Sequence, residues 1–199
     1  MAKEGHANSG GLEALAGAAR DAARRGPPPV HLWNPPFCGD LDMRIAADGT
    51  WYYLKTPIGR PALVRLFASV LKREDDKYFL VTPVEKCGIT VDDAPFVAVE
   101  LRHEGRGPDR TLHFRTNVDE WIACGPDHAL RFEPEAGTGG LKPYLHVRRN
   151  LWARVKQALF YDLADLGEEQ DVDGRRMFGV VSAGMFFPMA GAETLKDLP

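Results

Sequence analysis

The sequence predicts an α+β fold in which one antiparallel sheet-plus-helix unit occurs twice. Strand-like pairs flank a turn at residues 43–54 and again at residues 130–147. A helical pattern follows each pair, starting at Pro61 in the first copy and near Asn150 in the second. A short apolar strand then ends each copy, and these three shared features together predict the duplication.

The duplication also aligns basic residues. Arg60 and Arg65 in the first copy fall at the same offset as Arg149 and Arg154 in the second. Two related units packed side by side would form a cleft, and domain junctions are favoured ligand sites. The sequence therefore indicates where a ligand would bind, without identifying it.

Composition narrows the class of protein. The 199 residues suit one large domain or two small ones. The net charge of -3 argues against general nucleic-acid binding, which usually needs a basic excess. No apolar run approaches the roughly 20 residues of a membrane helix, and residues 1–9 lack the apolar core of a signal peptide. We therefore expect a cytoplasmic protein without a membrane span.

Proline and glycine divide the chain. We predict a mobile leader at residues 1–29, units at residues 30–90 and 91–190, and a tail at residues 191–199. Residues 12–25 are alanine-rich and could form a short helix, but its apolar face has little to bury. Residues 26–29 (GPPP) stop any such helix. We expect the leader to contribute little to stability.

The first unit opens with a hairpin around Asp48-Gly49, the strongest short-range hairpin signal. Pro61 is suited to the first position of a helix. Apolar residues then recur at helical spacing through residue 71, and Lys72-Arg73 would lie at the negative end of the helix dipole. Residues 78–81 form a short apolar strand.

The second half begins with strands at residues 96–101 and 111–115, which predict another hairpin. The helix predicted from about residue 150 would align Trp152, Val155, Leu159 and Leu163 on one side. Residues 167–174 are predicted to form a surface loop. Residues 185–189 are apolar, and we expect them to pack back on the sheet.

The three cysteines do not form a disulfide framework. Cys38, Cys87 and Cys124 are odd in number and widely spaced, and no C-x-x-C motif occurs. Each precedes a glycine, which is typical of a tight turn. We expect buried thiols beside turns, because free cysteine is commonly buried.

Arginines at the start of both predicted helices are the most unusual local feature. Arg60 precedes Pro61, and Arg148-Arg149 precede Leu151, with Asn150 as a possible N-cap. A cation at a helix N-terminus is unfavourable by roughly 0.3 to 1 kcal/mol unless an anion is shared. Free N–H groups with a guanidinium suit a phosphate or carboxylate. The alternative is that an internal Asp or Glu is the anion, or that the arginines extend into water.

Other chemistry is weakly indicated. Residues 137–142 (GTGGLK) lack the spacing of a phosphate-binding loop and lead into a strand. His103 and His113 are not a metal site without a third ligand. No serine lies in a G-x-S-x-G motif. We therefore predict no catalytic residue, no metal and no cofactor.

A set of short motifs resembles the bacterial family called domain of unknown function 1285. These motifs are CGDLDMRI (38–45), DGTWYY (48–53), PIGR (57–60), LVRLF (63–67), LVTPVEK (80–86), FRTN (114–117) and FYDL (160–163). The resemblance extends from Trp33 to Phe187. Cys87 departs from it, because a hydrophobic residue is expected there.

The resemblance implies a duplicated fold whose C-terminal half is superficially like pleckstrin-homology domains. It also implies a site for a nucleotide-like ligand between the halves and a role in signalling. The matched motifs contribute the candidate ligand residues Arg44, Arg60, Arg65, Glu85, Lys86, Arg115 and Asn117. The duplication contributes Arg148 and Arg149. Trp51 and Tyr52 could stack on a base, with core packing as the alternative.

We therefore predict a protein that senses a small anionic ligand. One alternative is an enzyme acting on a phosphorylated substrate, which would need a nucleophile, a metal or an acid–base pair. The other is a protein-interaction module that uses the pleckstrin-like half and the leader.

Overall fold

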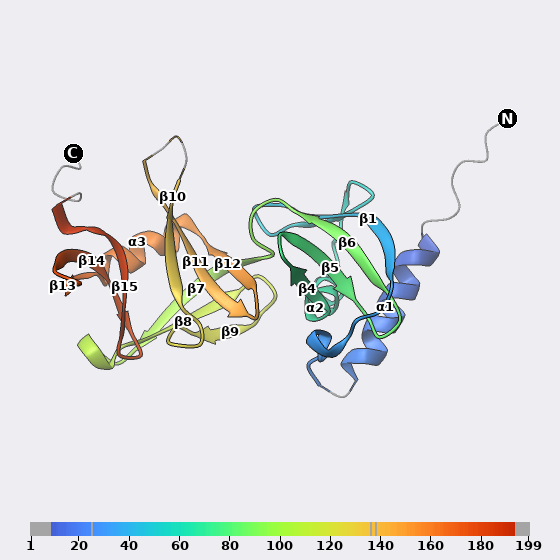
Figure 1. The fold of residues 1–199 in the computed structure, drawn as a ribbon, viewed down its shortest axis with the longest axis horizontal. Helices are drawn as coiled ribbons and strands as arrows, with labels where there is room; N and C mark the ends of the chain where they lie inside the picture. The colour runs from blue at the N-terminus through green and yellow to red at the C-terminus, as the bar shows by residue number, and fades with distance from the viewer. Residues whose placement is uncertain (1–8, 25, 136, 138, 194–199) are drawn as a thin grey trace. The chain divides into compact units, whose positions relative to one another are not determined.

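The computed structural model describes residues 9–24, 26–135, 137 and 139–193 (Figure 1). Contacts divide the chain into two units, Met1–Asp92 and Asp93–Pro199, and each is described by itself. In the described residues, the strands form two six-stranded sheets and one three-stranded sheet. Residues 1–8 of the predicted leader and 194–199 of the predicted tail lie outside the described residues.

The first unit holds one sheet and two α-helices among its described residues. Its strands follow the order β3-β2-β1-β6-β5-β4, with β1 and β6 parallel and the other neighbours antiparallel. The elements are α1 (Ser9–Ala23), the 3-10 turn η1 (Val30–Leu32), β1 (Phe37–Ile45), β2 (Trp51–Tyr53), β3 (Thr56–Pro57), α2 (Pro61–Ser69), β4 (Leu71–Glu74), β5 (Lys77–Val81) and β6 (Lys86–Val91).

The second unit carries the other six-stranded sheet in the order β10-β11-β12-β7-β8-β9, followed by a small antiparallel sheet of β13, β14 and β15. The elements are β7 (Phe96–Glu104), η2 (Gly107–Asp109), β8 (Thr111–Thr116), β9 (Trp121–Ala123), β10 (Leu130–Pro134), β11 (Leu141–Arg148), β12 (Leu151–Val155), α3 (Gln157–Asp165), β13 (Glu168–Val172), β14 (Arg175–Ser182) and β15 (Met185–Gly191).

The two large sheets have the same strand order. In each, the first and last strands are parallel neighbours at the centre, and the third and fourth strands form the edges. This confirms the predicted α+β fold with two similar units. The residue-level alignment was wrong, because β1 and β2 correspond to β7 and β8 and not to β10 and β11. The matched arginine offsets therefore have no structural basis.

The helices occupy different places in the two units. In the first, α2 begins at Pro61 as predicted and connects the two edge strands, β3 and β4. Leu63, Phe67 and Ala68 are its buried apolar residues. The helix ends at Ser69, so Lys72 and Arg73 lie on β4 and not at a helix terminus.

The helix predicted from residue 150 was wrong. Residues 151–155 form β12, which pairs with β11 and with β7, and α3 begins only at Gln157. Leu151, Ala153 and Val155 are buried while the residues between them are half-buried, and this period of two is typical of a strand. The predicted surface loop at residues 167–174 likewise contains a strand, β13.

Several local predictions are confirmed. Ile45 pairs with Trp51 across the Asp48-Gly49 turn, and β7 pairs with β8 as an antiparallel hairpin. The apolar segment at residues 185–189 forms part of β15 beside β14, with Phe187 and Met189 buried.

The leader buries more than its sequence predicted. Leu15, Ala16 and Ala19 of α1 are at most 2% exposed, and α1 lies against α2. Small alanine side chains let two helices approach closely, so an alanine-rich face can still pack. Within the described part of the chain, no helix has the length and hydropathy needed to cross a membrane.

The cysteines also differ from expectation. Cys87 and Cys124 are buried, but Cys38 is exposed. Burial raises the pKa of Cys87 to about 11 and that of Cys124 to about 12. The two buried thiols are therefore poor nucleophiles.

Candidate functional site

The aromatic residues proposed to stack on a base belong to opposite faces of the first sheet. Trp51 is 1% exposed and stacks on Phe67 of α2, with ring centroids 6.4 Å apart. Its role is core packing, the alternative that the sequence left open for Trp51. Tyr52 is half-buried and pairs with Arg44, whose guanidinium carbon lies 6.0 Å from its ring centroid.

Arg44 has an internal partner. Its Nε donates to Asp92 Oδ1 at 2.8 Å, and its Nη2 contacts Asp92 Oδ2. The hydrogen bond from Arg44 lowers the pKa of Asp92 and raises the pKa of Arg44. An internal carboxylate therefore balances this cation.

Lys86 belongs to a second closed cluster. Lys86 Nζ lies 2.8 Å from Glu74 Oε2, and Lys72 Nζ lies 2.9 Å from Glu74 Oε1. Hydrogen bonds from Lys86 and then from Lys72 lower the pKa of Glu74. The neighbouring Glu85 forms two hydrogen bonds through its backbone. Its N–H donates to Thr82 Oγ1, and its C=O accepts from the Thr82 N–H.

Arg60 occupies the predicted position at the start of α2. It is the N-cap residue, with an extended backbone, and its guanidinium lies 3.6 Å from Glu13 of α1. Arg60 and Arg20 also border a small pocket of about 130 Å³ over Leu63 and Leu66. Arg65, one turn further along α2, is exposed.

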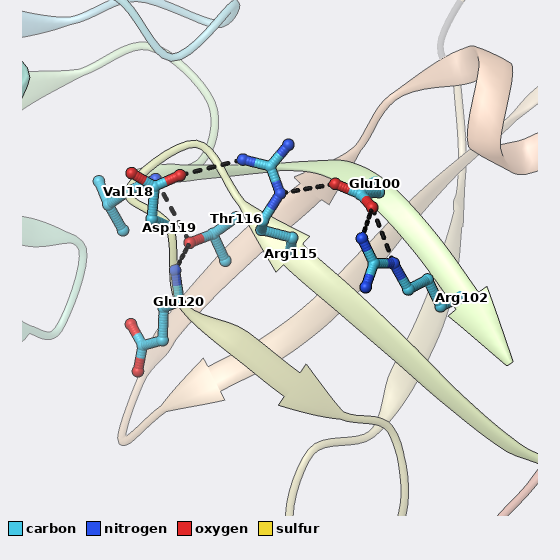
Figure 2. Close-up of polar contacts among 7 residues, drawn as sticks. All are labelled: Glu100, Arg102, Arg115, Thr116, Val118, Asp119 and Glu120. Carbon is cyan, nitrogen blue, oxygen red and sulfur yellow. Dashed lines mark hydrogen bonds and ion pairs between the residues drawn. The ribbon is translucent and has the colours of Figure 1, made fainter. Parts of the chain in front are cut away.

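Arg115 lies in a polar network on β7 and β8 (Figure 2). Its Nε donates to Glu100 Oε2 at 2.7 Å and its Nη1 to Asp119 Oδ1 at 3.0 Å. Arg102 donates to the other oxygen of Glu100. Hydrogen bonds from Arg115 and Arg102 lower the pKa of Glu100. The network joins Asp119 of the β8–β9 turn to β8 through Arg115, and both oxygens of Glu100 accept hydrogen bonds from arginines.

Asn117 completes the same turn. Its Oδ1 accepts the Val97 N–H at 3.0 Å, and its own N–H donates to Val97 O at 2.8 Å. The side chain thus extends the backbone pairing between β7 and β8, which is a structural role. The hydroxyl of Thr116 accepts from the N–H groups of Val118 and Glu120 within the turn (Figure 2).

Arg148 and Arg149 do not precede a helix, so the prediction of a helix N-terminal site there was wrong. They lie at the β11–β12 hairpin, where Arg149 has a positive φ of 51°. Arg148 Nη1 lies 2.6 Å from Glu120 Oε2, and its guanidinium covers the ring of Phe96 at 5.0 Å. Burial, and then the charge of Arg148, lowers the pKa of Arg149.

A better candidate is an open pocket of about 230 Å³ in the second unit, bounded by β11, β12 and the start of α3. Its polar and aromatic lining is Glu135, Lys142, Arg154, Gln157, Phe160 and Tyr161. We call this hollow the α3 pocket. Phe160 and Tyr161 lie in the matched FYDL motif, but the sequence analysis did not assign them to a site. Arg154 was missed as a pocket residue because it was assigned to a helix.

The two cations of the α3 pocket are loosely paired. Lys142 Nζ lies 3.5 Å from Glu135 Oε1, and Arg154 Nη1 lies 3.5 Å from Asp93 Oδ2. The pairs of Arg148, Arg115 and Lys86 described above are closed at 2.6 to 2.8 Å. A charge-assisted hydrogen bond is about 2.7–2.9 Å long. Both pocket cations can therefore improve their contacts by turning toward a bound anion.

An aromatic wall faces the same pocket. Tyr161 is 61% exposed, although large apolar rings usually gain from burial. Phe160 lies beside it, with centroids 6.4 Å apart. Gln157 Nε2 donates to Tyr161 Oη at 3.3 Å and orients the exposed ring. The pocket thus combines two cations and one carboxylate, Glu135, with an exposed aromatic ring.

The two histidines singled out in the sequence lie on neighbouring strands of the second unit. The described residues contain no group of three His, Cys, Asp or Glu side chains that could hold a metal ion. His113 pairs with Arg102 and His103 pairs with Leu112, so the two histidines are offset by one position and point to opposite faces of the hairpin.

Comparison with known proteins gives two family matches. Residues 28–94 match the model described as "Domain of unknown function (DUF1285), N-terminal domain", and residues 95–189 match "Protein of unknown function (DUF1285), C-terminal domain". No match was found among the curated proteins.

Two crystal structures of DUF1285 family proteins are similar. The one from Silicibacter pomeroyi DSS-3 has a TM-score of 0.83 and 52% sequence identity, over 92% of this chain and 97% of that chain. The one from Shewanella baltica OS155 has a TM-score of 0.50 and 30% identity, over 63% of this chain and 91% of that chain.

Proposed function

The chain belongs to the DUF1285 family, and we propose that this member binds a small anionic ligand in the α3 pocket. The proposal rests on one observation: two cations with long ion-pair contacts, Lys142 and Arg154, line the same pocket as the exposed ring of Tyr161. A phosphate or carboxylate would contact the cations. A planar group attached to it would lie on the ring, as in a nucleotide-like molecule.

The size of the pocket limits the ligand. Ligand pockets usually measure about 300–1,000 Å³, and this one measures about 230 Å³. It therefore suits one charged group and one ring, with any further part of the ligand in solvent. Arg154 lines the pocket and also contacts Asp93. A ligand that changes the Arg154–Asp93 contact would give the protein a sensing role.

Phenyl phosphate is a suitable first probe, because it carries a phosphate on a single ring. We expect it to bind more tightly than inorganic phosphate in a calorimetric titration of the full chain. Lys142→Ala and Arg154→Ala should each weaken binding about 10- to 100-fold, since a hydrogen bond to a charged group contributes about 1.5–3 kcal/mol.

Arg176→Ala is the matched control. Arg176 is an exposed arginine of the same unit that pairs with Glu169 and Asp171 and does not line the α3 pocket. Its replacement should leave phenyl phosphate affinity unchanged. Equal losses in Arg176→Ala and Arg154→Ala would indicate a general charge effect and contradict the proposed site.

A further inference from the structure

We propose that Asp93 is an internal competitor of the ligand for Arg154 and thereby sets the affinity of the α3 pocket. The inference rests on the proposed function, because it concerns the same pocket. It adds a residue outside the pocket lining that would weaken binding in the native protein.

The contacts of Asp93 are unequal. Its Oδ1 accepts a hydrogen bond from the hydroxyl of Tyr144 at 2.7 Å. Its Oδ2 is buried without a hydrogen bond in the described structure and lies 3.5 Å from Arg154 Nη1. Tyr144 therefore fixes the carboxylate of Asp93 in place. The second carboxylate oxygen faces Arg154 but is too far away to form a hydrogen bond with it.

Burial strengthens the effect of this charge. The Asp93 side chain is 19% exposed and that of Arg154 is 34% exposed, so solvent screens the pair only partly. Burial, and then the hydrogen bond to Asp93, raises the pKa of Tyr144, which therefore stays a hydroxyl donor to the carboxylate. Tyr144 thus holds the Asp93 side chain in place beside Arg154.

Two effects of Asp93 on a bound anion oppose each other. A carboxylate can orient an arginine toward its ligand. It can also neutralise the charge of the arginine and repel the bound anion. Orientation requires a closed hydrogen bond, and the 3.5 Å contact from Arg154 Nη1 does not provide one. The charge effect therefore dominates, and Asp93 lowers the affinity of the pocket.

The preceding residue provides a natural comparison. Asp92 belongs to the first unit and forms a hydrogen-bonded ion pair with Arg44, whereas Asp93 belongs to the second unit. Neither Asp92 nor Arg44 lines the α3 pocket. Asp92→Asn removes the same charge from the adjacent position without touching the Asp93–Arg154 contact.

The test is a double-mutant cycle read by phenyl phosphate titration of the full chain. Asp93→Asn keeps the shape of the side chain and should raise affinity about three- to tenfold, the size expected for one partly screened charge. Asp92→Asn should leave affinity unchanged. In an Arg154→Ala background, Asp93→Asn should have almost no effect, because its partner is gone.

The outcomes separate the two proposals. A loss or no change of affinity in Asp93→Asn overturns the competitor role, and so does an equal gain in the Arg154→Ala background. In both cases the proposed function stands if Lys142→Ala and Arg154→Ala still weaken binding. No binding by wild type or any variant overturns both proposals. If Asp93→Asn does not fold, as judged by circular dichroism, Asp93→Ser removes the same charge and gives the same comparison.

Discussion

The indole of Trp51 on β2 stacks on the phenyl ring of Phe67 on α2, with ring planes 22° apart. Both side chains are at most 1% exposed, and they join the sheet of the first unit to the helix that connects its edges. The pair therefore makes α2 part of the core of this unit.

Removing one ring of this pair should destabilise the first unit. Phe67→Ala should lower the free energy of unfolding by about 3–5 kcal/mol, because it leaves a cavity against Trp51. Urea denaturation followed by tryptophan fluorescence measures the change. Leu66→Ala on the same helix is the control and should cost less, since Leu66 is only half-buried. Equal costs would show that the stacked pair is not a main contact.

The docked α1 should contribute to stability. Leu15→Ala should lower the free energy of unfolding by about 2–3 kcal/mol, since Leu15 is 2% exposed where α1 lies against α2. Ala14→Ser, at an exposed position of the same helix, should change it little. Thermal unfolding of both variants checks this. An unchanged midpoint for Leu15→Ala would restore the view of α1 as a dispensable leader.

Asn117 should be a stability residue and not a ligand residue. Asn117→Ala removes the acceptor of the buried Val97 N–H and should lower the free energy of unfolding by about 1–3 kcal/mol. The affinity for phenyl phosphate should stay the same. A variant with normal stability and weakened binding would reverse this assignment.

The Glu74 cluster predicts a pH dependence. The pKa of Glu74 in the folded protein is below its ordinary value of 4.5. Its ionised form therefore adds stability above pH 4.5, and this contribution is lost as the pH falls from 4.5 through the lowered pKa. Urea denaturation of wild type and Glu74→Gln at pH 3 to 7 tests this. The stability difference between them should shrink toward acid pH, and a difference independent of pH would contradict the mechanism.

The cysteines should differ in reactivity. A thiol reagent at pH 8 should modify Cys38 in the folded protein and leave Cys87 and Cys124 unmodified, because the latter are buried with raised pKa values. Intact-mass spectrometry should then show one label in the native state and three after denaturation. Cys38→Ser should show none in the native state. Rapid native labelling of Cys124 would indicate local opening.

Local patterns in the sequence predicted the local parts of the fold. The Asp48-Gly49 hairpin, the start of α2 at Pro61 and the β7–β8 hairpin each depend on neighbouring residues. β12 was missed because Trp152, Val155, Leu159 and Leu163 are also spaced as on a helical face. The short alternating pattern of β12 does not outweigh this helical spacing, and the parallel pairing of β12 with β7 involves a strand that is far away in the sequence.

The candidate site shows the same limit. The sequence displays the cations, but it does not show their partners. Arg148 pairs with Glu120 and Arg115 with Glu100, and both carboxylates come from other strands or turns. Arg154 differs only in the length of its contact with Asp93, a property that appears in three dimensions alone.

The shared strand order has a consequence for the protein as it leaves the ribosome. β1 pairs with β6 and β7 pairs with β12, so until its last strand has been synthesised each large sheet consists of a three-stranded part and a separate two-stranded hairpin. Such late pairing is slow relative to hairpin formation. The first unit is complete once Val91 has emerged, before any strand of the second unit is available. A nascent chain stopped near residue 150 would therefore carry one finished sheet, the unjoined strands β7, β8 and β9, and the hairpin of β10 and β11. Their exposed edges make this the state in which the protein is most open to misassembly during its synthesis.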